Sequence, residues 1–64
     1  MTYEVRITNH FSGETYNVDL VSWQGNEGMS NGRAFNVQKE EAEKVAKKTA
    51  SLYDCEIIYN GKDL

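Results

Sequence analysis

Hydrophobic and polar residues alternate over the first eight positions of the chain. The apolar positions are Tyr3, Val5 and Ile7, and the positions between and around them are polar or charged, namely Thr2, Glu4, Arg6 and Thr8. A period of two is typical of a β-strand with one face on a core and the other in water. We therefore predict a first strand over residues 2–8.

A second β-rich run extends from Thr15 to Trp23, after a stretch of turn-forming residues at 10–13. One face of this run carries Tyr16, Val18 and Leu20, which predicts an antiparallel hairpin with the first strand. Val21 and Trp23 fall on the opposite face. Either a β-bulge near Val21 changes the register, or the outer surface of the sheet is partly apolar; we favour the bulge.

Residues 24–33 have the composition of a loop. They contain three glycines, two asparagines and no β-branched residue. Clusters of glycine and asparagine are typical of turns and loops, so we do not expect a strand to continue through this segment. Within it, Asn31-Gly32 is a candidate tight turn, which would lead into a short third strand around residues 33–35 along the edge of the second.

A helical pattern follows over residues 36–53. Spacings of three and four define one stripe of a helix, formed by Ala42, Val45, Ala46, Thr49, Leu52 and Tyr53. We expect Asn36 to act as the N-cap, and Lys47 and Lys48 to complement the helix dipole near its C-terminal end. The small side chains of Ala42, Ala46 and Ala50 imply that the helix packs closely on a sheet.

The segment Cys55–Tyr59 is predicted to be the last strand, and Asn60-Gly61 the turn that follows it. The last strand most simply joins the free edge of the first strand, which then lies centrally with the helix across one face. The predicted fold is α+β, with an antiparallel hairpin, one helix and a C-terminal strand. Its element order is β-β-(β)-α-β in a three- to four-stranded sheet, as a single domain over residues 1–64.

Length and composition limit the core. A chain of 64 residues with 39% hydrophobic residues and a mean hydropathy of -0.68 builds one thin core. Aromatic side chains are expected to supply much of its bulk, from Tyr3, Tyr16, Trp23, Phe35, Tyr53 and Tyr59. The β-branched and aromatic content is too high for a disordered chain.

The same sequence bears on location and on charged partners. No apolar run approaches the ~18 residues of a membrane span, and the first residues lack the pattern of a signal peptide, so we expect a cytoplasmic protein. Cys55 is the only cysteine, and we expect it to be a small buried residue of the last strand. The formal net charge is -3, and neither half of the chain is basic enough to indicate nucleic acid.

Few residues could support catalysis. His10 and Cys55 are too few for a typical zinc site, and a Cys-His dyad would need them within hydrogen-bond reach. We expect His10 to be an exposed turn residue, and no pair of carboxylates is placed for acid-base work. The chain is therefore predicted not to be an enzyme, with no catalytic, cofactor-binding or metal-binding residues.

Three glycines, Gly25, Gly28 and Gly32, precede a helix, with Arg33 beside them, and backbone N–H groups in such a place can bind phosphate. Their spacing matches neither the P-loop nor the dinucleotide fingerprint. Gly25 and Gly28 have the Gly-x-x-Gly spacing of K-homology RNA-binding domains, but Glu27 stands where a cation would help. We expect this segment to be a polar connector.

The most plausible contact surface lies around Trp23. Protein interfaces are enriched in Trp and Arg, which selects Trp23, Met29 and Arg33, together with Glu4 and Arg6 on the exposed face of the first strand. The alternative is that Trp23 only closes the end of the core. The helix lysines, Lys39, Lys44, Lys47 and Lys48, alternate with acids and form no positive stripe.

Residues 35–42, Phe-Asn-Val-Gln-Lys-Glu-Glu-Ala, connect a glycine-containing segment to the start of the helix. In this layout the chain resembles small acidic α+β proteins of unknown function encoded by phages and prophages. The resemblance implies an accessory protein that binds a host or phage protein, or obstructs a larger enzyme. It assigns no functional residue.

Together these observations predict a non-catalytic protein-binding module, either a monomer or a homodimer formed through a sheet edge. Two alternatives stay open. One is a nucleic-acid-associated protein that uses the lysine-bearing helix, and the other is a small thiol-dependent enzyme that uses Cys55.

Overall fold

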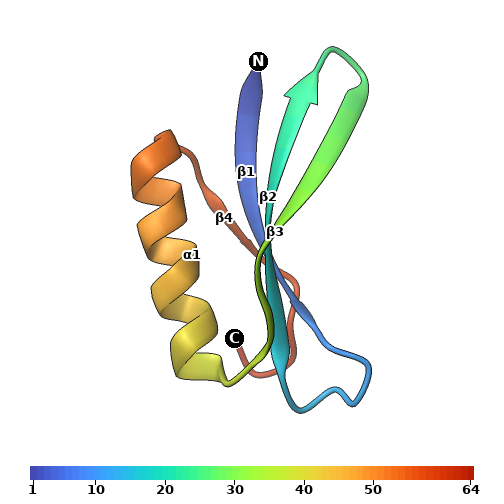
Figure 1. Ribbon diagram of the computed structural model, residues 1–64, viewed down its shortest axis with the longest axis vertical. Coiled ribbons are helices and arrows are strands. Elements are labelled where there is room, and N and C mark those ends of the chain that lie inside the picture. Colours follow the sequence, from blue (N-terminus) through green and yellow to red (C-terminus); the bar gives the residue numbers. More distant parts are fainter.

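The computed structural model describes residues 1–64 and begins with a long antiparallel hairpin (Figure 1). Strand β1 (Thr2–Asn9) and strand β2 (Tyr16–Gln24) pair without interruption, from Thr2 opposite Trp23 to Asn9 opposite Tyr16. In the connecting loop, Gly13 has φ +78°, a conformation that favours glycine. The two strands and the turn between them agree with the sequence prediction.

The favoured explanation for Val21 and Trp23 was wrong. Because the β1–β2 register is unbroken, no bulge separates these residues from the rest of β2. Val21 therefore lies on the outer surface of the sheet, and yet it is only 6% exposed. The second explanation, an outer surface that is partly apolar, describes the structure.

The predicted loop at 24–33 is also wrong, because most of it is strand. β3 (Glu27–Val37) pairs antiparallel with β2, from Gln24 opposite Glu27 to Asp19 opposite Gly32. The turn is the two-residue loop Gly25-Asn26, with Gly25 at φ +62°, whereas Asn31-Gly32 lies inside the strand. Gly-Asn is a recognised hairpin signal, since glycine adopts the positive φ that such a turn requires.

The last third of β3 is irregular. Its register against β2 shifts twice, between Asp19 and Val18 and again between Val18 and Tyr16. In the second irregularity Asn36 adopts φ +58°, and its backbone N–H donates to Asn17 Oδ1 at 2.9 Å. Asn36 is therefore a bulge residue, and the prediction that it caps the helix was wrong.

Helix α1 (Lys39–Tyr53) begins after Gln38, whose side chain makes no capping hydrogen bond. Its buried residues are Ala42, Ala46, Thr49 and Ala50. Leu52 was predicted on the same stripe but is 73% exposed. Ten residues separate it from Ala42, and at 3.6 residues per turn this places the two about 80° apart around the helix axis. The last turn contains no basic residue, so Lys47 and Lys48 do not flank the C-terminus.

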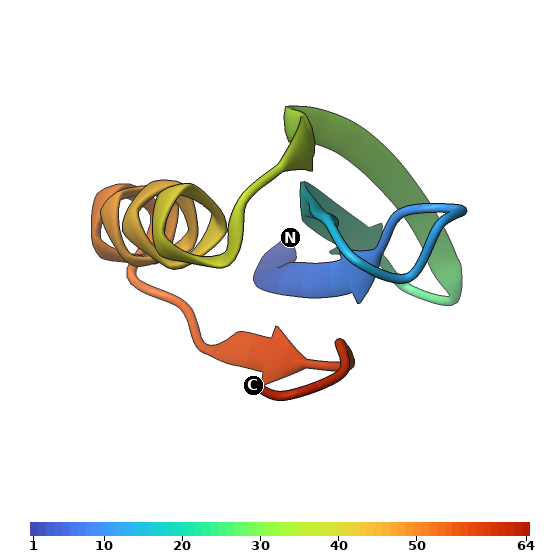
Figure 2. The same ribbon diagram turned by 90° about the horizontal axis from the view of Figure 1, so that it is seen from below.

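Strand β4 (Ile57–Tyr59) completes the sheet, in the order β3-β2-β1-β4. It runs parallel to β1, with Val5 opposite Ile57, so the predicted central position of the first strand is confirmed. β4 begins two residues later than predicted, and Cys55 lies before it. Helix α1 covers one face of the sheet, and no second helix covers the other (Figure 2).

The core lies between α1 and the sheet. Val5, Ile7 and Val18 are fully buried, and Tyr16 and Leu20 extend this apolar layer. At one end of the core the rings of Tyr3 and Tyr53 pack at 4.9 Å between centroids. Two of the aromatic residues expected in the core are not there, because Phe35 is 69% exposed and Tyr59 is 49% exposed. No helix of this protein has both the length and the apolar character needed to cross a membrane.

Candidate functional site

The sheet surface opposite α1, here called the outer face, is not covered by any helix (Figure 2). It is formed by alternate residues of the three antiparallel strands, in register across the sheet: Thr2, Glu4, Arg6 and Thr8 of β1, Asp19, Val21 and Trp23 of β2, and Gly28, Ser30 and Gly32 of β3. The outer face includes three of the five predicted contact residues.

Trp23 is held flat across one end of the outer face. Its indole Nε1–H donates a hydrogen bond of 3.1 Å to Oε1 of Glu4 on β1. On the other side the ring covers Gly28 of β3, where an added Cβ would stand 2.8 Å from the nearest ring atom. The absence of a side chain at Gly28 therefore lets the indole lie against the sheet, and Glu4 fixes its orientation.

Charged groups occupy the middle of the outer face. The Arg6 guanidinium donates from Nε to Oε2 of Glu4, so that Glu4 bridges Arg6 and Trp23. Asp19 lies opposite Arg6 on the neighbouring strand. The ion pair with Glu4 orders the Arg6 guanidinium, and the Arg6 side chain stays partly exposed.

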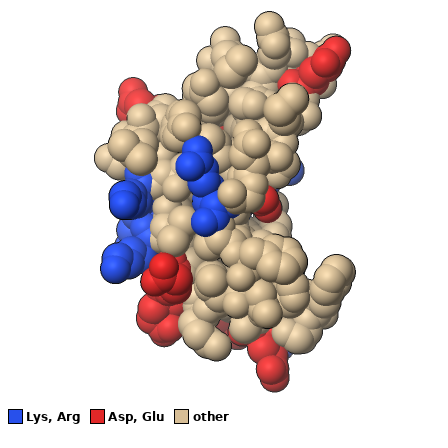
Figure 3. All heavy atoms as spheres, in the orientation of Figure 1, with Lys and Arg blue, Asp and Glu red and all other residues tan.

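A shallow hollow of about 530 Å³ lies over this region. Its lining residues are Arg6, Thr8, Asp19, Val21, Trp23, Asn26, Gly28 and Ser30. β3 contributes only glycine and serine to the outer face, so few side-chain atoms project from the sheet on that side. In Figure 3 the outline of the molecule is indented on its right-hand side, between the β2–β3 hairpin tip and the loop after β1.

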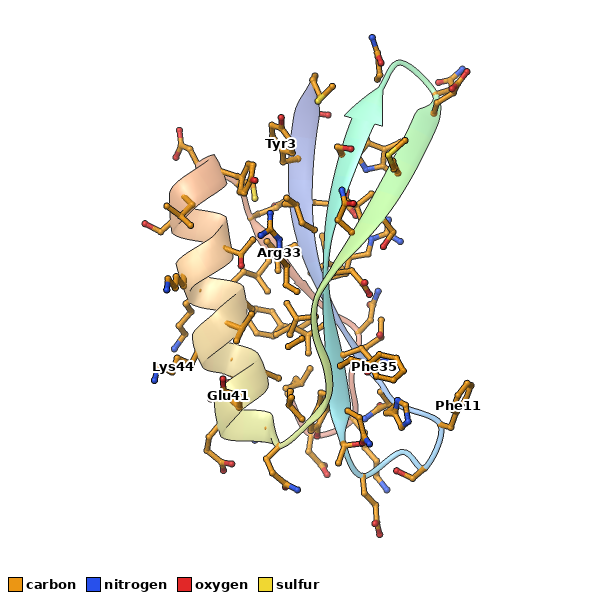
Figure 4. The ribbon with its side chains drawn as sticks, in the orientation of Figure 1. Tyr3, Phe11, Arg33, Phe35, Glu41 and Lys44 are labelled. Atoms are coloured by element: carbon orange, nitrogen blue, oxygen red, sulfur yellow. The ribbon has the colours of Figure 1, made fainter.

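An aromatic cluster stands at the opposite end of the outer face from Trp23. The ring of His10 packs edge-on against Phe35, with centroids 4.7 Å apart, and against Phe11 at 5.0 Å. Phe11 is 99% exposed and Phe35 is largely exposed. Figure 4 shows both phenylalanines at the end of the molecule away from the hairpin tip. His10, Phe11 and Phe35 are here called the aromatic cluster.

Sequence reasoning missed the aromatic cluster. Phe35 was assigned to the core, and His10 was expected to be only an exposed turn residue. A signal was present in Phe11, because a large apolar side chain inside a turn-forming segment has no core to reach. Phe35 could not be placed from the pattern, since the bulges of β3 decide which face its side chain takes.

The structure separates the predicted contact residues into two groups. Trp23, Glu4 and Arg6 are joined on the outer face, whereas Met29 and Arg33 are on the helix side of β3. Met29 pairs with Ser22, one position out of phase with Trp23 and Gly28. The prediction treated this segment as a loop, but in a strand successive side chains alternate between faces.

Arg33 is bound on the helix side of the sheet. Its Nη2 donates a hydrogen bond of 2.9 Å to the Tyr53 hydroxyl, and its guanidinium lies 5.5 Å from the centre of the Tyr53 ring. Figure 4 places Arg33 between the sheet and α1. Arg33 therefore links β3 to the end of the helix and is not part of a surface that contains Trp23.

The Cys55 and His10 side chains do not form a dyad. Cys55 lies two residues before Ile57, which pairs with Val5, whereas His10 follows the other end of β1. At ~3.3 Å per residue of strand, the two positions are roughly 20 Å apart. Burial raises the pKa of the Cys55 thiol, and the nearby carboxylates of Asp54, Glu56 and Glu4 add to this effect.

The remaining ionisable groups form no cluster with metal-binding geometry. No group of three or more His, Cys, Asp or Glu side chains is placed to hold a metal ion. Lysine side chains on α1 are bordered by acidic ones, as the blue and red atoms at the left of Figure 3 show. Such a mixed surface gives little net attraction for phosphate.

Comparison with protein-family models, with curated proteins and with solved structures finds no match to this chain. The resemblance to phage proteins therefore stays a prediction carried by residues 35–42. In the structure these residues join the bulged end of β3 to the first turn of α1. The candidate site rests on the geometry of the outer face and the aromatic cluster.

Proposed function

We propose that this chain is a non-catalytic protein-binding module that binds a protein partner through its outer face. The observation that carries the proposal is a hollowed sheet face, uncovered by any helix, with aromatic side chains at both of its ends. Trp23 stands at one end and the aromatic cluster at the other. Between them lie the charged groups of Arg6, Glu4 and Asp19.

The exposure of the aromatic cluster supports a binding role. Burying a phenylalanine side chain stabilises a protein or a complex by about 1.5–3 kcal/mol. A domain with so thin a core would gain from placing Phe11 and Phe35 inside, yet both are largely exposed. When the same side chains are buried against a partner, their burial stabilises the complex instead. Clustered aromatic residues are typical anchors of protein interfaces.

The charges of the outer face favour protein over nucleic acid. Two carboxylates, Glu4 and Asp19, accompany the single cation Arg6, and the whole chain has a formal charge of -3. Phosphate binding depends on the release of counterions by an excess of cations, which this face does not have. A protein surface with interspersed polar groups can instead pair with fixed carboxylates and a guanidinium.

The resemblance over residues 35–42 extends the proposal to a phage or prophage origin and to a host or phage protein as the partner. Such a module acts by occupying a surface of a larger protein. We also propose that the protein is cytoplasmic, because a single free thiol at Cys55 is typical of proteins in a reducing compartment.

A site-specific crosslink tests the proposal. A photo-crosslinking amino acid replaces Thr8 on the outer face, and in a matched control it replaces Lys48 on α1. The expected result is one protein crosslinked from position 8 in source cells and none from position 48. Affinity between that purified protein and this chain is then measured by calorimetry.

The purified pair gives the sharper measurement. Phe11→Ser should weaken binding by about tenfold or more, as loss of an interface anchor does. Because Phe11 is fully exposed, the variant should fold as the wild type does. The control Leu52→Ser also removes an exposed apolar group, here from α1, and should leave the affinity unchanged. Equal loss in both variants, or retention of the chain on heparin at moderate salt, would overturn the proposal.

A further inference from the structure

Strand β3 is a sheet edge with an open run of backbone. Its residues 27–32 pair in regular register with β2 on one side, and every one of them is exposed. No strand pairs with β3 on its other side, as the sheet order β3-β2-β1-β4 requires (Figure 1). The opposite edge, β4, has only three residues. An open edge of this length is a template for another strand.

The hairpin geometry identifies which backbone groups of β3 are free. Gln24 and Glu27 flank a two-residue loop, so they form a hydrogen-bonded pair. Hydrogen-bonded and non-hydrogen-bonded pairs then alternate along an antiparallel ladder. It follows that Gly28, Ser30 and Gly32 direct their N–H and C=O groups away from β2.

We propose that a second copy of this chain pairs antiparallel with β3 along this edge, with Ser30 opposite Ser30 of the second copy. In this register Gly28 lies opposite Gly32 of the second copy, and Gly32 lies opposite Gly28 of the second copy. All three outward-directed residues of each chain then fall in hydrogen-bonded pairs. The result is a two-fold symmetric dimer with one continuous sheet, to which each copy contributes four strands.

Charge complementarity selects this register. With Ser30 at the centre, Glu27 stands opposite Arg33 of the second copy, and two-fold symmetry forms this pair twice. Glu27 and Arg33 both belong to the helix side of β3, so their side chains can meet. Shifting the centre to Met29 puts Glu27 opposite Asn31, and shifting it to Asn31 puts Glu27 opposite Phe35. Neither alternative pairs opposite charges.

The ends of the pairing segment agree with the same centre. The hairpin turn ends β3 before Glu27, and the first register shift lies just after Gly32. The outward-directed residues of this regular stretch run from Gly28 to Gly32, and Ser30 is their midpoint. Arg33 already donates from Nη2 to Tyr53, and the guanidinium has further N–H donors for a carboxylate.

Dimerisation would place two outer faces side by side. A two-fold axis perpendicular to the sheet keeps both helices on one side and both outer faces on the other. One outer face is about six residues long and three strands wide. At ~3.3 Å per residue and ~4.8 Å between strands, its area is roughly 300 Å². This is below the ~800 Å² that each partner buries in a standard interface, and a dimer doubles it. The pairing itself does not depend on the proposed function.

The mass in solution tests the proposal. Sedimentation equilibrium of the wild type over a concentration series should approach twice the 7.3 kDa chain mass. Ser30→Pro removes a free N–H at the centre of the edge and should sediment as a monomer. Proline is tolerated where the N–H of an edge strand faces outward, so the fold should survive, and circular dichroism checks this.

A charge-exchange pair makes the register itself testable. In Glu27→Arg the new arginine faces Arg33 of the second copy at both symmetry-related contacts. This repulsion should raise the dimer dissociation constant by about tenfold. Adding Arg33→Glu to it restores the opposite charges in the reverse arrangement and should recover dimerisation. A wild type that stays monomeric at all concentrations would overturn the proposal. So would a folded Ser30→Pro dimer, or a double variant no better than Glu27→Arg alone. Binding of a partner protein by monomers would leave the proposed function standing.

Discussion

Trp23 lies directly opposite Gly28 on the neighbouring strand, and its indole ring fills the space where a side chain at position 28 would begin. Gly28 does not have a positive φ, so its backbone conformation does not require glycine. What requires glycine there is the close approach of the ring. The bond from the indole N–H to Glu4 then fixes Trp23 across three strands.

Gly28→Ala should therefore destabilise the fold. The added methyl group would stand within 3.0 Å of three ring atoms of Trp23, and relieving this overlap costs about 1–3 kcal/mol in packed sites. Urea unfolding followed by tryptophan fluorescence measures the change. At the control position Gly32 the nearest atom is 3.8 Å away, so Gly32→Ala should be neutral or stabilising by up to about 1 kcal/mol. Equal effects at both positions would contradict the close approach of the ring.

Asn36 should tolerate glycine better than alanine. At φ +58° an ordinary L-residue is disfavoured by about 1–2 kcal/mol, whereas glycine is not. The Asn36 side chain also accepts a 2.6 Å hydrogen bond from the Thr15 hydroxyl, which both variants lose. Asn36→Ala should thus lower the free energy of unfolding by more than Asn36→Gly does. Chemical denaturation of both variants distinguishes this backbone effect from a loss confined to the side chain.

Truncation should destabilise the protein at Ile7 but have little effect at Leu52, although both are large aliphatic residues. Ile7 is fully buried, and Ile7→Val should cost about 0.5–1.5 kcal/mol through the methylene removed from a packed core. Leu52 is exposed, so Leu52→Ala should change the free energy of unfolding by less than about 0.5 kcal/mol. Thermal and urea unfolding report both values. A larger loss at Leu52 would mean that another surface covers it.

Cys55 should react slowly with alkylating reagents near neutral pH. Its pKa is raised above the ordinary value of 9.0 by burial and by the carboxylates of Asp54, Glu56 and Glu4, so the reactive thiolate is scarce. The alkylation rate of the folded protein should rise at a higher pH than that of the urea-unfolded chain. A rate profile matching that of the unfolded chain would contradict the shift.

The same shift determines how Cys55 affects stability. Above the unfolded pKa, the unfolded state releases the thiol proton while the folded state keeps it, so the unfolded state binds fewer protons. The free energy of unfolding therefore falls as pH rises from about 9. It stops falling once the folded-state pKa is passed. Subtracting the pH profile of Cys55→Ser isolates this contribution from those of lysines and tyrosines.

Local patterns were sufficient for most of the fold. The alternation at Tyr3, Val5 and Ile7 places β1 correctly, and the spacing of Ala42 and Ala46 places the buried side of α1. Both succeed because each element buries one side, which forces a periodic sequence. β3 was missed because its helix-side positions Glu27, Asn31 and Arg33 are polar and exposed, so neither face of the strand carries the apolar alternation that would mark it.

The candidate site was predicted less completely. Trp23, Glu4 and Arg6 were selected for their residue types and are indeed joined in the structure. Met29 and Arg33 were placed with them only because they are close in sequence. The aromatic cluster joins Phe35 to Phe11, residues from two elements whose meeting depends on the bulges of β3.

The sequence by itself determined the periodic elements and their order, because hydrophobic period and turn chemistry are local properties of the chain. Tertiary structure alone decided the long β3 edge, the side on which Arg33 lies and the exposure of Phe35. These depend on register between strands, and a shift of one residue moves a side chain from one face of the sheet to the other.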